Sequence, residues 1–154
     1  MENTSVHHDI SYIWTRLHPR WLATGLIAGL GAGLIMLCLA AYLSTTIHED
    51  LTFPVKLIGS SLSAGFLIHF SLAGFFGVVF SQFVSENSRK RSLLLLSFLG
   101  GLAVWLFWFA MFMPSFNEAM TFFLPKKISL LLHVVFGLSF GLLVVWIRPF
   151  LCKK

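Results

Sequence analysis

The sequence predicts an all-α membrane protein with four transmembrane helices, and three observations support this fold class. Hydrophobic residues make up 57% of the 154 residues and charged residues only 11%, which is far from the balance of a soluble domain. The mean hydropathy is correspondingly high, at +0.86. Four apolar segments are separated by short polar stretches, and each is near or above the roughly 20 residues that a helix needs to cross a bilayer. We therefore expect one membrane domain over residues 1–154.

An N-terminal arm, residues 1–20, precedes the first apolar segment. Four apolar side chains between positions 10 and 17 recur at helical spacing, which predicts a short interfacial helix that ends at Pro19. The first transmembrane helix is expected at 21–43. That segment is too long for the core of a signal peptide and is not followed by a cleavage site.

Small residues recur every fourth position in the first segment, at Gly25, Gly29 and Gly33. Such stripes let helix backbones approach closely in lipid, where no hydrophobic effect drives helices together. We therefore expect this face of the helix to pack against another helix.

The other three helices are expected at 57–84, 92–113 and 128–147. The second segment is longer than a bilayer requires, which predicts either a tilted helix or a start outside the hydrocarbon region. The first and third loops each contain a Ser/Thr-x-x-Glu sequence followed by Pro and Lys, which predicts capped turns. The third loop is also rich in Phe, which indicates a second short interfacial helix.

Basic residues are unevenly distributed between the two sides of this topology. Eight Lys and Arg lie in the arm, the second loop and the C-terminal tail, and three lie in the first and third loops. Because basic residues gather on the cytoplasmic side, both termini are predicted to be cytoplasmic. The same rule explains the net charge of +5 without a nucleic-acid partner. The expected partners are the lipid bilayer and, beyond it, other membrane subunits or further copies of the chain.

The two halves of the chain share a sequence pattern. Each has a glycine-rich segment, a capped turn, and a second segment in which His is followed at four-residue spacing by two small residues. These positions are His69, Ala73 and Gly77 in the first half, and His133, Gly137 and Gly141 in the second. The pattern suggests two parallel-repeat hairpins related by an axis along the membrane normal. Chance similarity between apolar helices is the alternative.

His69 and His133 are the ionisable residues inside the second and fourth segments. Each lies about 15 residues, or roughly 22 Å of helix, before the predicted cytoplasmic end. Buried imidazoles tend to face a bundle interior, and three interpretations are open. Each neutral ring could hydrogen-bond a serine or a backbone carbonyl. The pair could ligate a haem b, with the glycines leaving room for the macrocycle. The pair could also form a proton or ion relay.

Catalysis has little support in the sequence. No segment combines Ser, His and Asp, Cys and His, or paired carboxylates at one depth, and all six acidic residues lie in the termini or loops. We expect no enzymatic activity, no resident metal and no cofactor, with haem b as the alternative. Cys38 and Cys152 fall at opposite ends of the predicted topology, so no disulfide within the chain is expected.

The run from Gly25 to Met36, together with His69 and the sequence Leu132-His133-x3-Gly137-x3-Gly141, resembles the YagU-like and related families of small bacterial inner-membrane proteins. The resemblance implies a bacterial inner membrane and no assigned reaction. We therefore expect a non-catalytic scaffold, accessory subunit or stress-related membrane component. The alternatives are a haem-binding or proton-relay bundle, and a small oligomeric transporter.

Overall fold

The computed structural model describes residues 19–47, 61–83, 88–107 and 126–151, and within these ranges the chain forms four α-helices and no strand. The helices are α2 (Pro19–Ile47), α4 (Leu62–Phe83), α5 (Lys90–Val104) and α8 (Lys126–Leu151). By length and composition, α2, α4, α8 and the helical stretch 90–107 can each cross a membrane. The prediction of an all-α chain with four candidate membrane-spanning helices is confirmed in these terms.

The first helix, α2, extends beyond the predicted range of 21–43 at both ends. It begins at Pro19 and ends at Ile47. Proline is accepted in a first helical turn because its missing N–H has no intrahelical partner there. The residue that was expected to end an interfacial helix therefore begins a transmembrane one. Near the other end, the hydroxyls of Thr45 and Thr46 each donate to a carbonyl three residues earlier.

The second helix, α4, begins at Leu62, later than the predicted 57, because Ser61 caps it. The Oγ of Ser61 accepts a hydrogen bond from the Ala64 N–H at 3.2 Å. The Ser61 carbonyl accepts the first helical bond, from the Gly65 N–H at 2.9 Å. This is the arrangement expected of a serine N-cap. The capped helix has 22 residues, a length that suits a bilayer core without extra tilt.

The last two helices differ from prediction in opposite ways. The α-helical part of α5 has only 15 residues, followed by a π-helical turn at 105–107. Its predicted end at 113 lies outside the described residues. By contrast, α8 has 26 residues and includes Pro149. Since Pro149 lies in the last turn, its missing N–H removes a single backbone bond at the end of the helix.

Several sequence-based predictions concern residues outside the described part of the chain. These are the interfacial helix of the N-terminal arm, the capped turn of the third loop and the short interfacial helix of that loop. The capped turn of the first loop lies only partly outside: its first residue, Thr46, belongs to the last turn of α2 and donates its hydroxyl to the Leu43 carbonyl, whereas Glu49 is not described.

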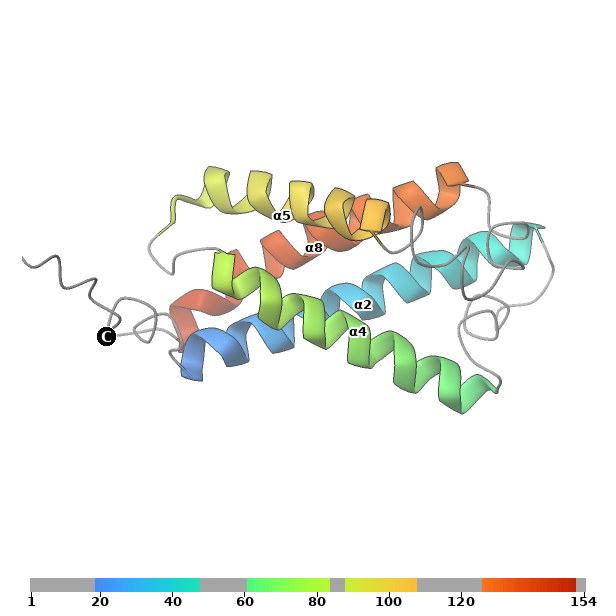
Figure 1. Ribbon diagram of the computed structural model, residues 1–154, viewed down its shortest axis with the longest axis horizontal. Coiled ribbons are helices and arrows are strands. Elements are labelled where there is room, and N and C mark those ends of the chain that lie inside the picture. The colour runs from blue at the N-terminus through green and yellow to red at the C-terminus, as the bar shows by residue number, and fades with distance from the viewer. Residues whose placement is uncertain (1–18, 48–60, 84–87, 108–125, 152–154) are drawn as a thin grey trace, which may run out of the picture.

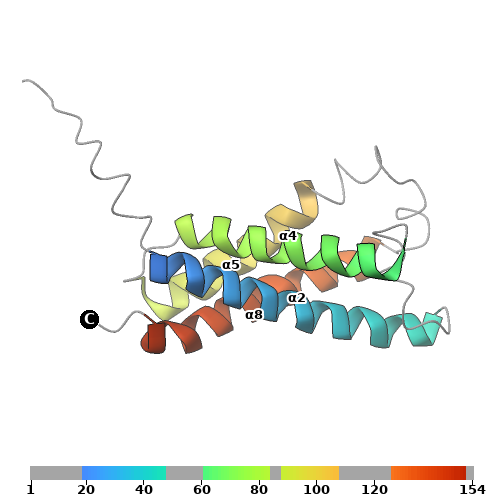
Figure 2. The same cartoon turned by 90° about the horizontal axis from the view of Figure 1, so that it is seen from below.

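Helices that follow each other in the chain run in opposite directions, so α2 and α5 are parallel and α4 and α8 run the other way (Figure 1). The view turned by 90° shows all four along the same long axis (Figure 2). α2 packs against both α4 and α8, and α5 packs against α8. The bundle is therefore two antiparallel hairpins, α2/α4 and α5/α8, joined mainly through α2 and α8.

The centre of the bundle contains small and aromatic side chains. Ala28 and Ala32 of α2 are fully buried, and Phe140 of α8 is almost fully buried. The Phe140 ring meets Phe80 of α4 edge to face, with 5.6 Å between centroids. Large apolar side chains stay exposed on every helix, for example Leu34, Leu67, Leu95 and Leu142. Because lipid chains solvate such side chains, this outward distribution is the one expected of a bundle in a bilayer.

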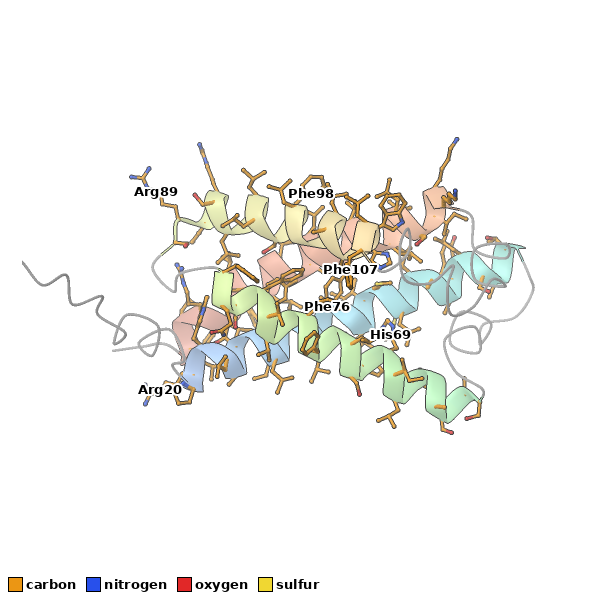
Figure 3. The ribbon with its side chains drawn as sticks, viewed as in Figure 1. Arg20, His69, Phe76, Arg89, Phe98 and Phe107 are labelled. Atoms are coloured by element: carbon orange, nitrogen blue, oxygen red, sulfur yellow. The ribbon has the colours of Figure 1, made fainter. Side chains whose placement is uncertain are left out.

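Basic side chains gather at one end of the bundle, where α2 and α5 begin and α4 and α8 end. Figure 3 labels two of them, Arg20 and Arg89, at that end. We call this the basic end and define it by five described residues: Arg20, Arg89, Lys90, Arg91 and Arg148. Lys126 and Lys127 begin α8 at the opposite end.

Candidate functional site

His69 joins α4 to α2 through a hydrogen bond inside the bundle. The side chain is only 8% exposed, and its Nε2 lies 2.9 Å from the carbonyl oxygen of Gly33. Because a carbonyl only accepts, Nε2 carries the hydrogen and donates it. The close approach depends on Gly33: a Cβ there would lie 2.6 Å from the Cβ of Ala73, the residue one turn after His69. The imidazole therefore binds a helix that glycine allows to come near.

His133 also bonds a backbone carbonyl, but within its own helix. Its Nδ1 donates to the Ser129 carbonyl, one turn earlier in α8, at 2.8 Å. The side chain is half-buried. The predicted interpretation of neutral rings that bond a carbonyl describes both histidines, with a different nitrogen used in each.

His69 and His133 are each the eighth residue of their helices, and α4 and α8 run in the same direction. When both rings are neutral, these hydrogen bonds leave His69 with a lone pair on Nδ1 and His133 with one on Nε2. The pair therefore has one acceptor nitrogen on each ring.

The glycine stripe of α2 lies against α4, as its spacing predicts. Gly29 and Gly77 form the point of closest approach: a Cβ on Gly77 would lie 2.7 Å from the Cα of Gly29 and would overlap the carbonyl of Gly25. One turn away, a Cβ on Gly25 would lie 2.7 Å from the Cβ of Ser81. We call this set of contacts the first crossing. A larger residue at any of these glycines would push the two backbones apart.

A second crossing of the same kind joins α5 and α8. Here Gly101 and Gly137 meet, and a Cβ on either would lie 3.1 Å from the Cα of the other. A Cβ on Gly141 would lie 2.9 Å from the Cβ of Ser97. All seven small residues singled out in the sequence, Gly25, Gly29, Gly33, Ala73, Gly77, Gly137 and Gly141, therefore lie at helix contacts.

Sequence reasoning did not single out Ser97 and Gly101 as contact residues. Their four-residue spacing is a small-xxx-small pattern, but a single pair of small residues in an apolar segment is a weak signal. Only the position of Gly137 opposite them shows that this pair forms a crossing.

The register of the two hairpins also differs from the one that the histidine spacing suggested. The spacing aligned His69 with His133 and Gly77 with Gly141. The contacts instead place Gly77 and Gly137 in equivalent positions, each opposite the central glycine of its partner helix. Ala73 then corresponds to His133, one helical turn away from the alignment based on histidine.

Two features of this arrangement bear on the haem alternative. The Nε2 of His69 is engaged by the Gly33 carbonyl. Gly137 and Gly141, the residues that were expected to leave room for a macrocycle, face α5 at distances that already exclude a methyl group. Within the described ranges, no three His, Cys, Asp or Glu side chains come together as a metal site.

The geometry of the site is thus two helix crossings and two carbonyl-bound histidines. Comparison of the chain with protein-family models, curated proteins and solved structures finds no match in any of the three.

Proposed function

We propose that this chain is a bacterial inner-membrane protein that acts as a scaffold or accessory subunit and has no reaction of its own. One observation carries the proposal: His69 and the small residues of the interior hold helix to helix. His69 donates to the carbonyl of Gly33 on α2. At both crossings, the space beside each central glycine is occupied by the backbone of the partner helix. The surfaces available to another protein are therefore the outward faces of the helices.

The outward faces offer long rows of exposed apolar side chains. On α5 these include Leu95, Leu96 and Leu99, each between 45% and 59% exposed. In lipid, a second membrane helix packs onto such a face through shape and dispersion, because burial from water contributes nothing there. α5 packs only against α8 among the closely contacting helix pairs, so we propose its free face as the contact with a partner subunit.

Site-specific photo-cross-linking in native membranes tests this role. A photoreactive residue at Leu99, on the outward face of α5, is expected to give one protein adduct of constant mass. The same residue at Leu132, which is 3% exposed, is the matched interior control and should react only within the chain. Adducts to lipid alone from Leu99 and from the outward faces of the other three helices would contradict the scaffold proposal.

We also propose that both termini face the cytoplasm. The basic end carries five of the seven described Lys and Arg residues, and such residues favour the cytoplasmic side. Of two reporters fused after Lys154, the one that is active only in the cytoplasm should give a signal, and the one that is active only in the periplasm should not. A periplasmic signal from that fusion would reverse the orientation.

A proton relay is the second candidate function, and the acceptor nitrogens left on His69 and His133 favour it. An imidazole titrates near neutral pH and passes protons between its two nitrogens. If the pair relays protons, purified protein in liposomes should dissipate an imposed pH gradient, and His133→Ala should stop this without loss of folding. Equal leakage from both proteins would remove the relay from consideration. The same preparation tests the haem hypothesis, since a Soret band lost in His69→Ala would support haem.

A further inference from the structure

The charge of the protein is concentrated at the basic end. The segments joined to this end, residues 1–20, 84–91 and 148–154, contain eight basic and three acidic residues. Their net charge of +5 equals that of the whole chain. The segments joined to the opposite end contain three basic and three acidic residues and are neutral overall. The segments joined to the two ends therefore differ strongly in net charge.

The most accessible part of the basic end is the start of α5. Arg89, Lys90 and Arg91 are consecutive, and all three are exposed. Figure 3 shows Arg89 at the edge of the bundle, directed away from it. The first turn of α5 contains no acidic residue. Three adjacent cations are thus presented outward without a carboxylate in the same turn.

Arg148 places the end of α8 next to this group. Its Nη1 donates to the carbonyl of Ser88, immediately before Arg89, at 3.0 Å. Because the bond joins residues 60 positions apart, it fixes the last turn of α8 beside the start of α5 and adds the half-buried Arg148 guanidinium to the three cations. Arg148 is therefore both the support of this group and a member of it.

Two aromatic rings at the same end indicate the depth of these cations in a bilayer. Trp146 and Phe150 of α8 are each 67% exposed, and their rings meet with 5.8 Å between centroids. Exposed Trp in a transmembrane helix is enriched at the level of the lipid headgroups. Since Arg148 lies between these two residues in the last turns of α8, the four cations lie near the same level.

We propose that Arg89, Lys90, Arg91 and Arg148 form a binding site for the headgroups of anionic phospholipids. The guanidinium groups would bond phosphate oxygens directly, and Lys90 would contribute as a point charge. Trp146 and Phe150 would contact the adjoining glycerol and upper acyl chains. The site goes beyond the scaffold function and does not depend on it, because a bundle of any function in an anionic membrane would bind lipid here.

The test uses the full-length protein in an uncharged detergent. Phosphatidylglycerol and phosphatidylcholine are added separately, and the bound lipid is counted by native mass spectrometry. The triple variant Arg89→Gln, Lys90→Gln, Arg91→Gln is compared with Lys126→Gln, Lys127→Gln, which removes cations from the opposite end. Each basic residue near an anionic surface is worth about fivefold in binding. We expect the triple variant to lose at least tenfold in phosphatidylglycerol affinity and the control to stay within about twofold.

Other outcomes would overturn the proposal. Equal losses in the triple variant and the control would mean a general attraction to the net charge. Equal binding of phosphatidylcholine, or full competition by inorganic phosphate at the same concentration, would exclude an anionic lipid site. If the triple variant does not fold, the single changes Arg89→Gln and Arg91→Gln, at exposed side chains, keep the test available. Each should then lower the affinity about fivefold.

Discussion

The two hairpins of the bundle, α2/α4 and α5/α8, use the same backbone crossing with different polar side chains. In the first crossing Gly29 meets Gly77, and in the second Gly101 meets Gly137. Around the first, His69 donates across the interface to α2. Around the second, His133 donates within α8 and contributes no bond to α5. The backbone contact is thus common to both hairpins, while the polar contact is particular to each.

The small residues one turn from each crossing are exchanged between the hairpins. Gly25 of α2 faces Ser81 of α4, whereas Ser97 of α5 faces Gly141 of α8. Each pair contains one glycine and one serine, and the serine comes from the second helix in one hairpin and from the first helix in the other. The combined side-chain volume of the facing pair is therefore the same in both hairpins, although the residue contributed by each helix differs.

This comparison indicates that the combined size of facing residues determines where two helices can cross in lipid. A repeat aligned on these contacts would pair Gly77 with Gly137. Four sets of substitutions break or sharpen the comparison, and all are measured by thermal or denaturant unfolding of the purified chain in detergent.

The largest effect is expected at the central glycines. Gly77→Leu should lower the free energy of unfolding by about 3 kcal/mol or more, because even its Cβ would overlap the Gly25 carbonyl and force the backbones apart. Gly137→Leu should have an effect of similar size if the crossings are equivalent. Gly74→Ala is the control on α4, since its Cβ would meet only side-chain carbons of Leu26 and Leu30, at 3.0 Å or more, and no backbone. A mild effect of Gly137→Leu beside a severe one of Gly77→Leu would end the equivalence.

A smaller loss, about 1–3 kcal/mol, is expected from Gly141→Ser, which places two serines opposite each other. The added Cβ would lie 2.9 Å from that of Ser97. The double change Gly141→Ser with Ser97→Gly recreates the order of the first hairpin and should recover most of the stability. Additive losses in the double variant would contradict the idea that the facing pair acts as a unit.

The histidines should differ from each other. His69→Ala removes an interhelical hydrogen bond and is expected to lower the free energy of unfolding by about 1 kcal/mol. His133→Ala removes a bond within one helix, and we expect less than half of that effect. His69→Gln keeps an N–H donor and serves as the matched control, with partial recovery expected. Equal losses for both Ala variants would mean that the interhelical bond to Gly33 adds nothing.

The smallest effect concerns the serine hydroxyls. The Oγ of Ser97 is buried and finds no hydrogen-bond partner in the described part of the chain, so Ser97→Ala should be neutral within about 0.5 kcal/mol. Ser81 donates its hydroxyl to the Val78 carbonyl at 2.6 Å, and Ser81→Ala should be the more costly of the two. The reverse order would show that the Ser97 hydroxyl has a partner in the membrane.

The sequence by itself determined the four helices, because their length and apolar content depend only on local composition and on the thickness of a bilayer. It also indicated the small residues at helix contacts, since their four-residue spacing places them on one helical face. Helix ends were less predictable. Pro19 begins α2 and Ser61 caps α4, whereas α5 begins after Arg89 with no side-chain cap.

Only the tertiary structure decided which small residues face each other and which carbonyl each histidine bonds. Gly101 stands opposite Gly137, and Gly33 opposite His69, because segments 36 residues apart in the chain pack at one particular height. If one helix were shifted by one turn along its neighbour, the spacing of small residues within each helix would be unchanged, but every residue would face a different partner. Local spacing fixes the face of a helix, whereas its height against a neighbour depends on the summed fit of all facing side chains, which no single segment contains.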